Sequence, residues 1–281
     1  MLFDLQSPRR RRVVQIVFGT LAAVFAISFV FFGVGTGGIG GIGDLLGSGG
    51  GGSDASSAFD DDIEEQEKKL TLNPNDTAAL AELVQLHYSA GIQNVDENGA
   101  LTNDGEQDLQ QSADAWNKYV KVSRSNVDPG VALVAYQMYY VLAQAEFGSA
   151  AGSSSSADQL QSLQNTVAAL KGAAEAQRVV VVAQPNVASW QKVAEALYLA
   201  GDAQGARQAI AEAEKVDPAA AAKLEQQLKT TQEEGATLAR AITQLTKQQQ
   251  AGTGGATGGG ATPLPGLEGG GLGGAGALGG G

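Results

Sequence analysis

The sequence predicts an all-α protein, an α-solenoid of antiparallel helix pairs that follows one transmembrane helix. Three observations lead to this prediction. A 20-residue run near the amino terminus contains no charged residue, and most of the 39 glycines fall in two short segments. In the glycine-poor middle of the chain, apolar residues recur at spacings of three and four, which is the periodicity of amphipathic helices.

The amino-terminal 34 residues have the pattern of a membrane anchor. Residues 1–12 form a basic segment with four arginines, Arg9 to Arg12, and a net charge of +3. The uncharged run from Val13 to Phe32 follows, and a helix of that length crosses the roughly 30 Å hydrocarbon layer of a bilayer. We therefore predict a transmembrane helix over 13–34.

A cleaved signal peptide is the alternative for this segment. Its apolar core would be shorter, about 7–15 residues, and would end in a small-residue cleavage site. Neither feature is present here. Because basic flanks stay in the cytoplasm, we expect a single-pass protein of the plasma (inner) membrane, with its amino terminus inside and its carboxyl-terminal domain extracytoplasmic.

Glycine marks the boundaries of the middle domain. Twelve glycines lie between positions 33 and 53, and sixteen lie between positions 252 and 281. We predict a Gly/Ser-rich linker over 35–58 and a disordered tail over 251–281, because such compositions bury too little apolar surface to order. The segment between them, 59–250, is long enough for one helical domain with its own core.

The clearest repeat unit in that domain spans 187–218. Its apolar positions fall on one face of two successive helices, which Gly201-Asp202 separates and Asp217-Pro218 ends. A second unit begins at Asn73-Pro74, and a third occupies 130–183 with a register that the spacing leaves open. Two insertions, 94–106 and 148–157, interrupt the pattern.

The 187–218 unit resembles a tetratricopeptide repeat (TPR). Counting Trp190 as the fourth position places small residues at the eighth, fifteenth, twentieth and twenty-seventh positions and a proline at the thirty-second: Ala194, Gly201, Ala206, Ala213 and Pro218. With its basic start, span and glycine tether, the chain is similar to membrane-anchored TPR proteins of actinobacterial-type bacteria. The resemblance implies three degenerate repeats over about 59–218 and a scaffold that binds other proteins.

The segment after the repeats, 219–250, predicts one more helix. Its apolar seam alternates by four and three: Leu224, Leu228, Thr231, Gly235, Leu238, Ile242 and Leu245. This spacing suits a helix that caps the solenoid, and it also suits the heptad of an oligomerising coiled coil. Thr231 and Gly235 weaken the coiled-coil interpretation, so we expect a C-terminal capping helix.

The resemblance also implies a peptide-binding groove along the first helices of the repeats. The second, fifth, ninth and twelfth positions are Ala78, Ala81, Gln85 and Tyr88 in one repeat, and Ala188, Gln191, Glu195 and Tyr198 in another. Tyr136 and Tyr140 lie in the middle unit, where core packing is the alternative role. The predicted groove therefore consists of Gln85, Tyr88, Tyr136, Tyr140, Gln191, Glu195 and Tyr198.

Composition excludes several functional classes. The chain has no cysteine and a single histidine, His87, which falls at a core position of the repeat. The net charge of −15 beyond the apolar run disfavours nucleic acid as a partner. The insertion 94–106 imitates a calcium loop but has Asn94 first and Gly105 twelfth, where the pattern requires acids, so a turn-rich insertion is the better interpretation. We predict no catalytic residue, cofactor or metal site.

These observations favour a non-enzymatic, membrane-anchored TPR scaffold that mediates protein–protein interactions on the extracytoplasmic side, as an assembly or secretion accessory. The partners expected are a protein or peptide in the groove and the lipid bilayer around 13–34. The alternative is a structural envelope protein that forms homo-oligomers through its C-terminal helix and glycine-rich tail.

Overall fold

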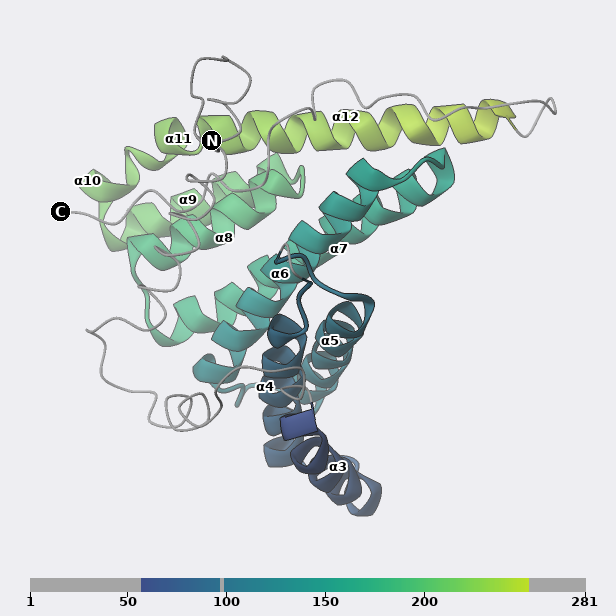
Figure 1. The fold of residues 1–281 in the computed structure, drawn as a ribbon. Helices are drawn as coiled ribbons and strands as arrows, with labels where there is room; N and C mark the ends of the chain where they lie inside the picture. Colours follow the sequence, from purple (N-terminus) through teal and green to yellow (C-terminus); the bar gives the residue numbers. More distant parts are fainter. Residues whose placement is uncertain (1–56, 97–98, 253–281) are drawn as a thin grey trace, which may run out of the picture. The chain divides into compact units, whose positions relative to one another are not determined.

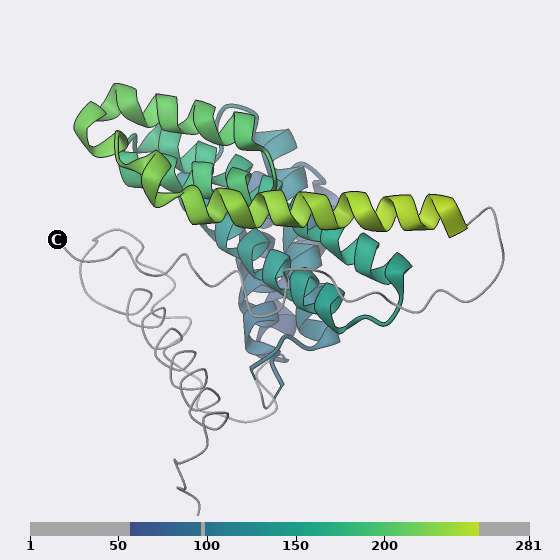
Figure 2. The same cartoon turned by 90° about the horizontal axis from the view of Figure 1, so that it is seen from above.

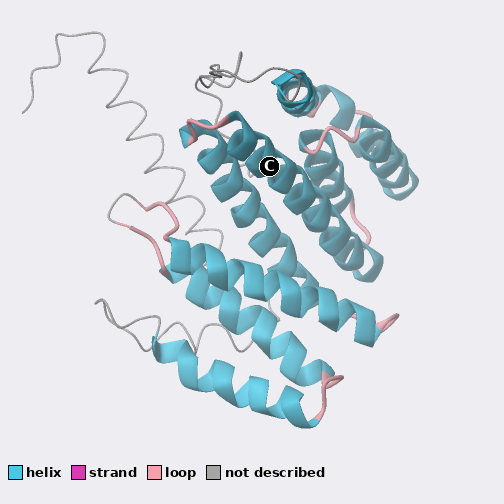
Figure 3. Cartoon of the chain, turned by 90° about the vertical axis from the view of Figure 1, so that its right-hand side faces the viewer, coloured by secondary structure: helices cyan, strands magenta, loops and turns pink. Residues whose placement is uncertain are grey.

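The computed structural model describes residues 57–96 and 99–252, all within one compact unit. Over these residues the protein is all-α, as predicted, and contains no strand (Figure 3). None of the helices described there is both long and apolar enough to cross a bilayer. The predicted basic segment 1–12, the predicted span 13–34, and all but the last two residues of the predicted linker lie outside the described residues. So does the predicted tail 251–281 except its first two residues, which are helical at the end of α12.

The helices form consecutive pairs (Figure 1). Helix α3 (Ser57–Leu72) packs on α4 (Thr77–Gln93), and α4 pairs with α5 (Asn103–Ser123). The next pairs are α6 (Pro129–Gly152) with α7 (Ser156–Ala183), and α8 (Val187–Leu199) with α9 (Ala203–Val216). Contacts of α5 with α6 and of α7 with α8 join the pairs.

N-capping residues mark where these helices begin. Asp76, Thr102, Asp128, Ser155, Asn186 and Asp202 each accept a hydrogen bond from a backbone N–H in the first turn of the helix that follows. Between α8 and α9, Gly201 has a φ of +77°, which a residue with a side chain rarely adopts. The α8–α9 hairpin therefore forms where the repeat pattern predicts it.

The predicted insertion at 148–157 is mostly helical. Helix α6 continues to Gly152 and α7 begins at Ser156, so only 153–155 connect them. Two alanines, Ala150 and Ala151, favour the helix, and Ala150 is buried in a cluster with Leu160 and Leu163. The prediction of a long insertion was wrong because small residues were taken for a loop.

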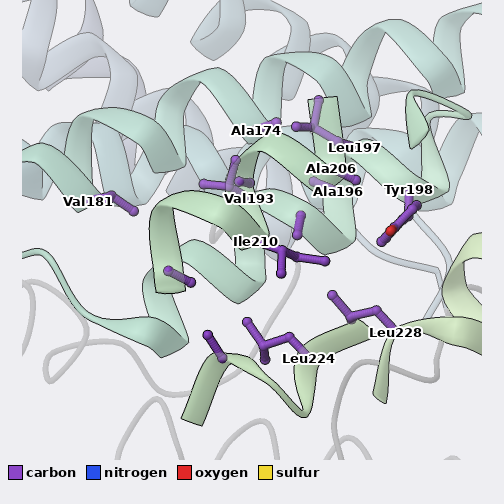
Figure 4. Packing of buried hydrophobic residues seen from close by; sticks show 14 of the residues in the cluster. Ala174, Val181, Val193, Ala196, Leu197, Tyr198, Ala206, Ile210, Leu224 and Leu228 are labelled. Carbon is purple, nitrogen blue, oxygen red and sulfur yellow. The ribbon is translucent and has the colours of Figure 1, made fainter. Parts of the chain in front are cut away.

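The predicted single capping helix over 219–250 is divided into three helices. These are α10 (Pro218–Ala221), α11 (Leu224–Gln227) and α12 (Lys229–Gly252). The chain breaks here because Leu224 and Leu228 turn into the α8–α9 core (Figure 4). Helix α12 then crosses α8 and α7, rather than stacking on α9 at the end of the array (Figure 2).

Buried polar contacts join α4 and α5. Ser112 is fully buried, and its Oγ donates a 2.7 Å hydrogen bond to the Val84 carbonyl oxygen of α4. His87 is buried, as its repeat position predicts, with its Nδ1 3.4 Å from Asp108 Oδ1 of α5. Trp116 packs beside Tyr119, with 5.9 Å between the ring centroids.

Candidate protein-binding groove

An open groove of about 680 Å³ lies between α4, the end of α5 and the start of α6. Three of the four residues that the repeat resemblance assigned to α4 line it, namely Ala78, Ala81 and Gln85. The other lining residues are Thr77, Glu82, Tyr119, Val122, Ser123, Asn126, Asp128 and Val131. Sequence reasoning missed this second set, because α5 and the α5–α6 connection bring it to α4 only through folding.

The rim of this groove is acidic. Glu82 and Asp128 are exposed, and no lysine or arginine is among the described residues that line the groove. One oxygen of Asp128 accepts a hydrogen bond from Gly130 N at 2.6 Å, while the Asp128 backbone N–H donates to the Tyr119 hydroxyl at 2.9 Å. The groove therefore presents a negative edge beside small and apolar side chains.

Tyr88, the fourth predicted residue on α4, is not among the lining residues of this groove. It is half-buried, and burial raises the pKa of its phenol to about 12. At neutral pH its hydroxyl is therefore a neutral hydrogen-bonding group.

The predicted residues of the two later repeats meet at a different place, where α6 packs near α8. The rings of Tyr136 and Tyr140 lie 5.6 Å apart, and Lys192 Nζ lies 5.8 Å from the centre of the Tyr136 ring. The Tyr140 hydroxyl is buried with no hydrogen-bond partner. Burial raises the pKa of both tyrosines far above the ordinary value, and the Glu195 carboxylate adds to the effect.

Glu195 has an unusual electrostatic environment in this cluster. Burial raises the pKa of its carboxyl group to about 7; nearby Lys192 opposes the shift, and Glu234 of α12 increases it. A carboxyl group with this pKa is partly protonated at neutral pH. It can therefore donate or accept a hydrogen bond, according to what lies against it.

The carboxyl-terminal helices cover part of the predicted groove. Tyr198 is only 4% exposed and belongs to a core cluster with Leu224 and Leu228 of the α11 region. At Gly235 of α12 there is no room for a side chain, because a Cβ there would overlap the Tyr198 carbonyl oxygen. Gln191 stays half-buried and Ala188 exposed. Of the seven predicted residues, Gln85 alone lines the open groove on α4, while Tyr198 lies against Gly235 of α12.

The predicted coiled-coil seam is the surface by which the C-terminal segment packs on its own chain. Leu238 and Leu245 are buried with Leu160 and Leu163 of α7, and Ile242 packs against the same cluster. Leu224, Leu228 and Gly235 are buried as well, while Thr231 is half-buried. The apolar face of α12 that a coiled coil would bury between two chains is therefore buried against α7 of its own chain.

A second hollow of about 710 Å³ lies between α5, α6 and α7. Two side-chain hydrogen bonds cross it: Tyr139 OH donates to Asn117 Oδ1 at 3.2 Å, and Asn165 Nδ2 donates to Glu146 Oε1 at 2.9 Å. No sequence signal marks it, because its residues come from three helices without a shared motif.

Backbone hydrogen bonds join the described residues at the two ends of the 94–106 insertion, 94–96 and 99–106. Val95 and Leu101 form an isolated antiparallel bridge, and Asn94 Nδ2 donates to Asp108 Oδ2 at 3.1 Å. A Cβ on Gly105 would lie 2.5 Å from the Asn94 carbonyl oxygen, so the twelfth position has no room for an acid. Within 57–96 and 99–252, no group of three His, Cys, Asp or Glu residues is arranged to hold a metal ion.

No family model, no curated protein and no solved structure matches this chain.

Proposed function

We propose that the chain is a non-enzymatic, membrane-anchored scaffold, built as a TPR-like solenoid, that binds a protein or peptide in the groove on α4. The observation that supports it is the position of Ala78, Ala81 and Gln85. The repeat resemblance selected these residues as ligand positions, and they line an open groove of about 680 Å³. That volume falls in the range typical of ligand pockets.

The charge of the groove suggests the kind of segment that it binds. Alanines at positions 78 and 81 leave room for a ligand backbone to approach α4, and Glu82 adds a negative charge at the edge. Complementary charge favours a segment with lysine or arginine near this edge. We propose a basic peptide segment of a partner protein as the ligand.

The proposed setting is the extracytoplasmic side of the inner membrane. The uncharged run from Val13 to Phe32 and the arginines that precede it support a single-pass anchor with a cytoplasmic amino terminus. A binding domain on a glycine-rich tether suits an assembly or secretion accessory.

Site-specific photocrosslinking in native membranes tests the proposal. A photoreactive residue at Ala81 is expected to capture a discrete partner, while the same residue at exposed Glu214 on α9 is the control. Glu82→Lys in the Ala81 probe is expected to reduce capture, since it reverses the charge at the edge of the groove. Equal capture from both positions, or capture that ignores the Glu82 charge, would contradict the proposal.

Self-association through the C-terminal helix has less support. Its expected seam, including Leu238 and Leu245, is buried against α7 of the same chain. Light scattering of the detergent-solubilised full chain is expected to give the mass of a monomer. A concentration-dependent dimer would support the alternative, a structural envelope protein that self-associates.

A further inference from the structure

We infer that the face formed by α6, α7 and α8 is a helix-binding surface that α12 occupies as an internal ligand. Its external ligand would be an amphipathic helix with a glycine where α12 has Gly235 and a basic or amide residue where α12 has Glu234. This inference rests on the proposed protein-binding function, and it names a partner class for the covered part of the predicted groove.

The first half of α12 approaches α8 through glycine. Gly235 lies directly on the backbone at the end of α8, where a Cβ would overlap the Tyr198 carbonyl oxygen. On the other side of the contact, a Cβ on Gly201 would lie 3.4 Å from Ala239 Cβ. Gly235 therefore permits a backbone approach that any larger residue at this position would prevent, whereas a Cβ at Gly201 would make an ordinary contact.

The second half of α12 is held by apolar side chains. Leu238, Ala241 and Leu245 are each at most 4% exposed, and they share a cluster with Ala150 of α6 and with Leu160 and Leu163 of α7. The remaining side of α12 is in solvent, with Glu233, Arg240 and Lys247 exposed. Helix α12 thus has the one-sided pattern of an amphipathic helix bound on a surface.

Two polar groups beside the contact have no matching partner on α12. Glu234 is exposed on α12, and its negative charge adds to the burial that raises the pKa of the Glu195 carboxyl group on α8. The buried Tyr140 hydroxyl of α6 has no hydrogen-bond partner. A helix with Lys or Gln at the position of Glu234 would remove the repulsion and offer Glu195 a hydrogen-bond donor. Such a helix is expected to compete with α12.

The test measures binding of a fluorescent peptide with the sequence 229–252 to the full chain in detergent. In the chain, Gly235→Ala pushes α12 off its site, while Gly148→Ala is the matched control, because nothing lies within 4 Å of a Cβ on Gly148 of α6. We expect the peptide to bind the Gly235→Ala chain roughly tenfold more tightly than the wild-type or Gly148→Ala chain, because only the former exposes its surface.

Changes in the peptide test the ligand chemistry. Glu234→Lys in the peptide is expected to tighten binding several-fold, and Gly235→Ala in the peptide is expected to weaken it roughly tenfold. A Leu245→Asp chain is the second variant, since it removes an anchor of α12 and leaves the surface on α6, α7 and α8 unchanged. If the Gly235→Ala chain loses helical circular dichroism, the Leu245→Asp chain takes its place in the test. The Leu245→Asp chain is then expected to bind the peptide roughly tenfold more tightly than the wild-type chain.

Two results would overturn the inference. One is no peptide binding to either variant chain while its helical circular dichroism is retained, and the other is equal binding of the native and Gly235→Ala peptides. If either occurs while the Ala81 probe still captures a partner, the scaffold function stands and only the helix-binding surface is rejected. Loss of capture from Ala81 with peptide binding intact would reject the α4 groove instead.

Discussion

Glu195 is a carboxyl group enclosed between α6, α8 and α12, and its position makes stability depend on pH. The groups that face it are Tyr136 and Tyr140 of α6, Lys192 on its own helix and Glu234 of α12. The folded-state pKa is about 7, above the ordinary value of 4.5. Between these two values the unfolded chain loses the proton and the folded chain keeps it. The free energy of unfolding therefore falls as pH rises through this window.

Glu195→Gln is expected to remove this pH dependence. The variant should match the wild type near pH 4.5 and exceed its free energy of unfolding by about 2 kcal/mol at pH 8, because the amide needs no proton to stay neutral. Urea denaturation at the two pH values measures the difference. Glu214→Gln, on the exposed side of α9, is the control. An equal effect of Glu195→Gln at both pH values would contradict the assignment.

Ser112 gives a second prediction at this scale. Its buried hydroxyl donates to the Val84 carbonyl oxygen across the α4–α5 contact. Ser112→Ala leaves that oxygen without its side-chain donor and is expected to lower the free energy of unfolding by about 1 kcal/mol. Thr243→Ala removes an exposed hydroxyl bonded within α12 and should change it little. Urea denaturation of both variants makes the comparison.

Helix α12 is attached by separable contacts, so its second half can be loosened alone. Leu245 is 2% exposed against α7. Leu245→Ala is expected to reduce the free energy of local opening of α12 by about 2–3 kcal/mol, because it leaves a cavity in that cluster. Hydrogen exchange should show faster exchange in α12 and unchanged exchange in α4 and α5. Uniform loss of protection across the domain would show that α12 is not a separate unit.

The loop between α4 and α5 is expected to be indifferent to calcium. Asn94 is directed to Asp108, and Gly105 has no room for the acid that would complete a calcium site. Addition of Ca²⁺ in the millimolar range should leave the melting temperature where Mg²⁺ leaves it, since a cation that does not bind the folded state does not stabilise it. A calcium-specific rise would contradict this.

Helix boundaries could be predicted wherever a single residue type determines them. Asp202 and Gly201 define the α8–α9 turn by capping and by a positive φ, and both effects are local. The break between α11 and α12 could not be predicted in this way. Leu224 and Leu228 have the same spacing as the later seam, and only the α8–α9 core turns them inward.

At the scale of the whole chain, the predicted orientation in the membrane rests on the charges that flank the apolar run. A net charge of +3 before the apolar run and −15 after it predicts that the folded domain is extracytoplasmic. In sealed spheroplasts, added protease is expected to digest the domain and spare a tag at the amino terminus. Protection of the domain with loss of the tag would reverse the topology.

The candidate site could be predicted only in part, for a reason that belongs to the whole molecule. A repeat pattern identifies Ala78 or Glu195 by position within a helix, and it has no information about what else folds onto that position. The residues Ala78, Ala81 and Gln85 line an open groove together with residues from the end of α5 and the start of α6. Tyr198 is buried because a segment more than 20 residues later packs on it.

The placement of the tryptophans has a practical consequence. The chain has two, Trp116 on α5 beside Tyr119 and Trp190 on α8 against the α8–α9 core. The intrinsic fluorescence of each tryptophan therefore reports on the folding of one end of the domain. Trp116→Phe leaves an optical probe of the end that α12 covers, and Trp190→Phe leaves one of the end that holds the open groove. Melting the two variants in parallel shows whether the protein loses its ends together or one at a time.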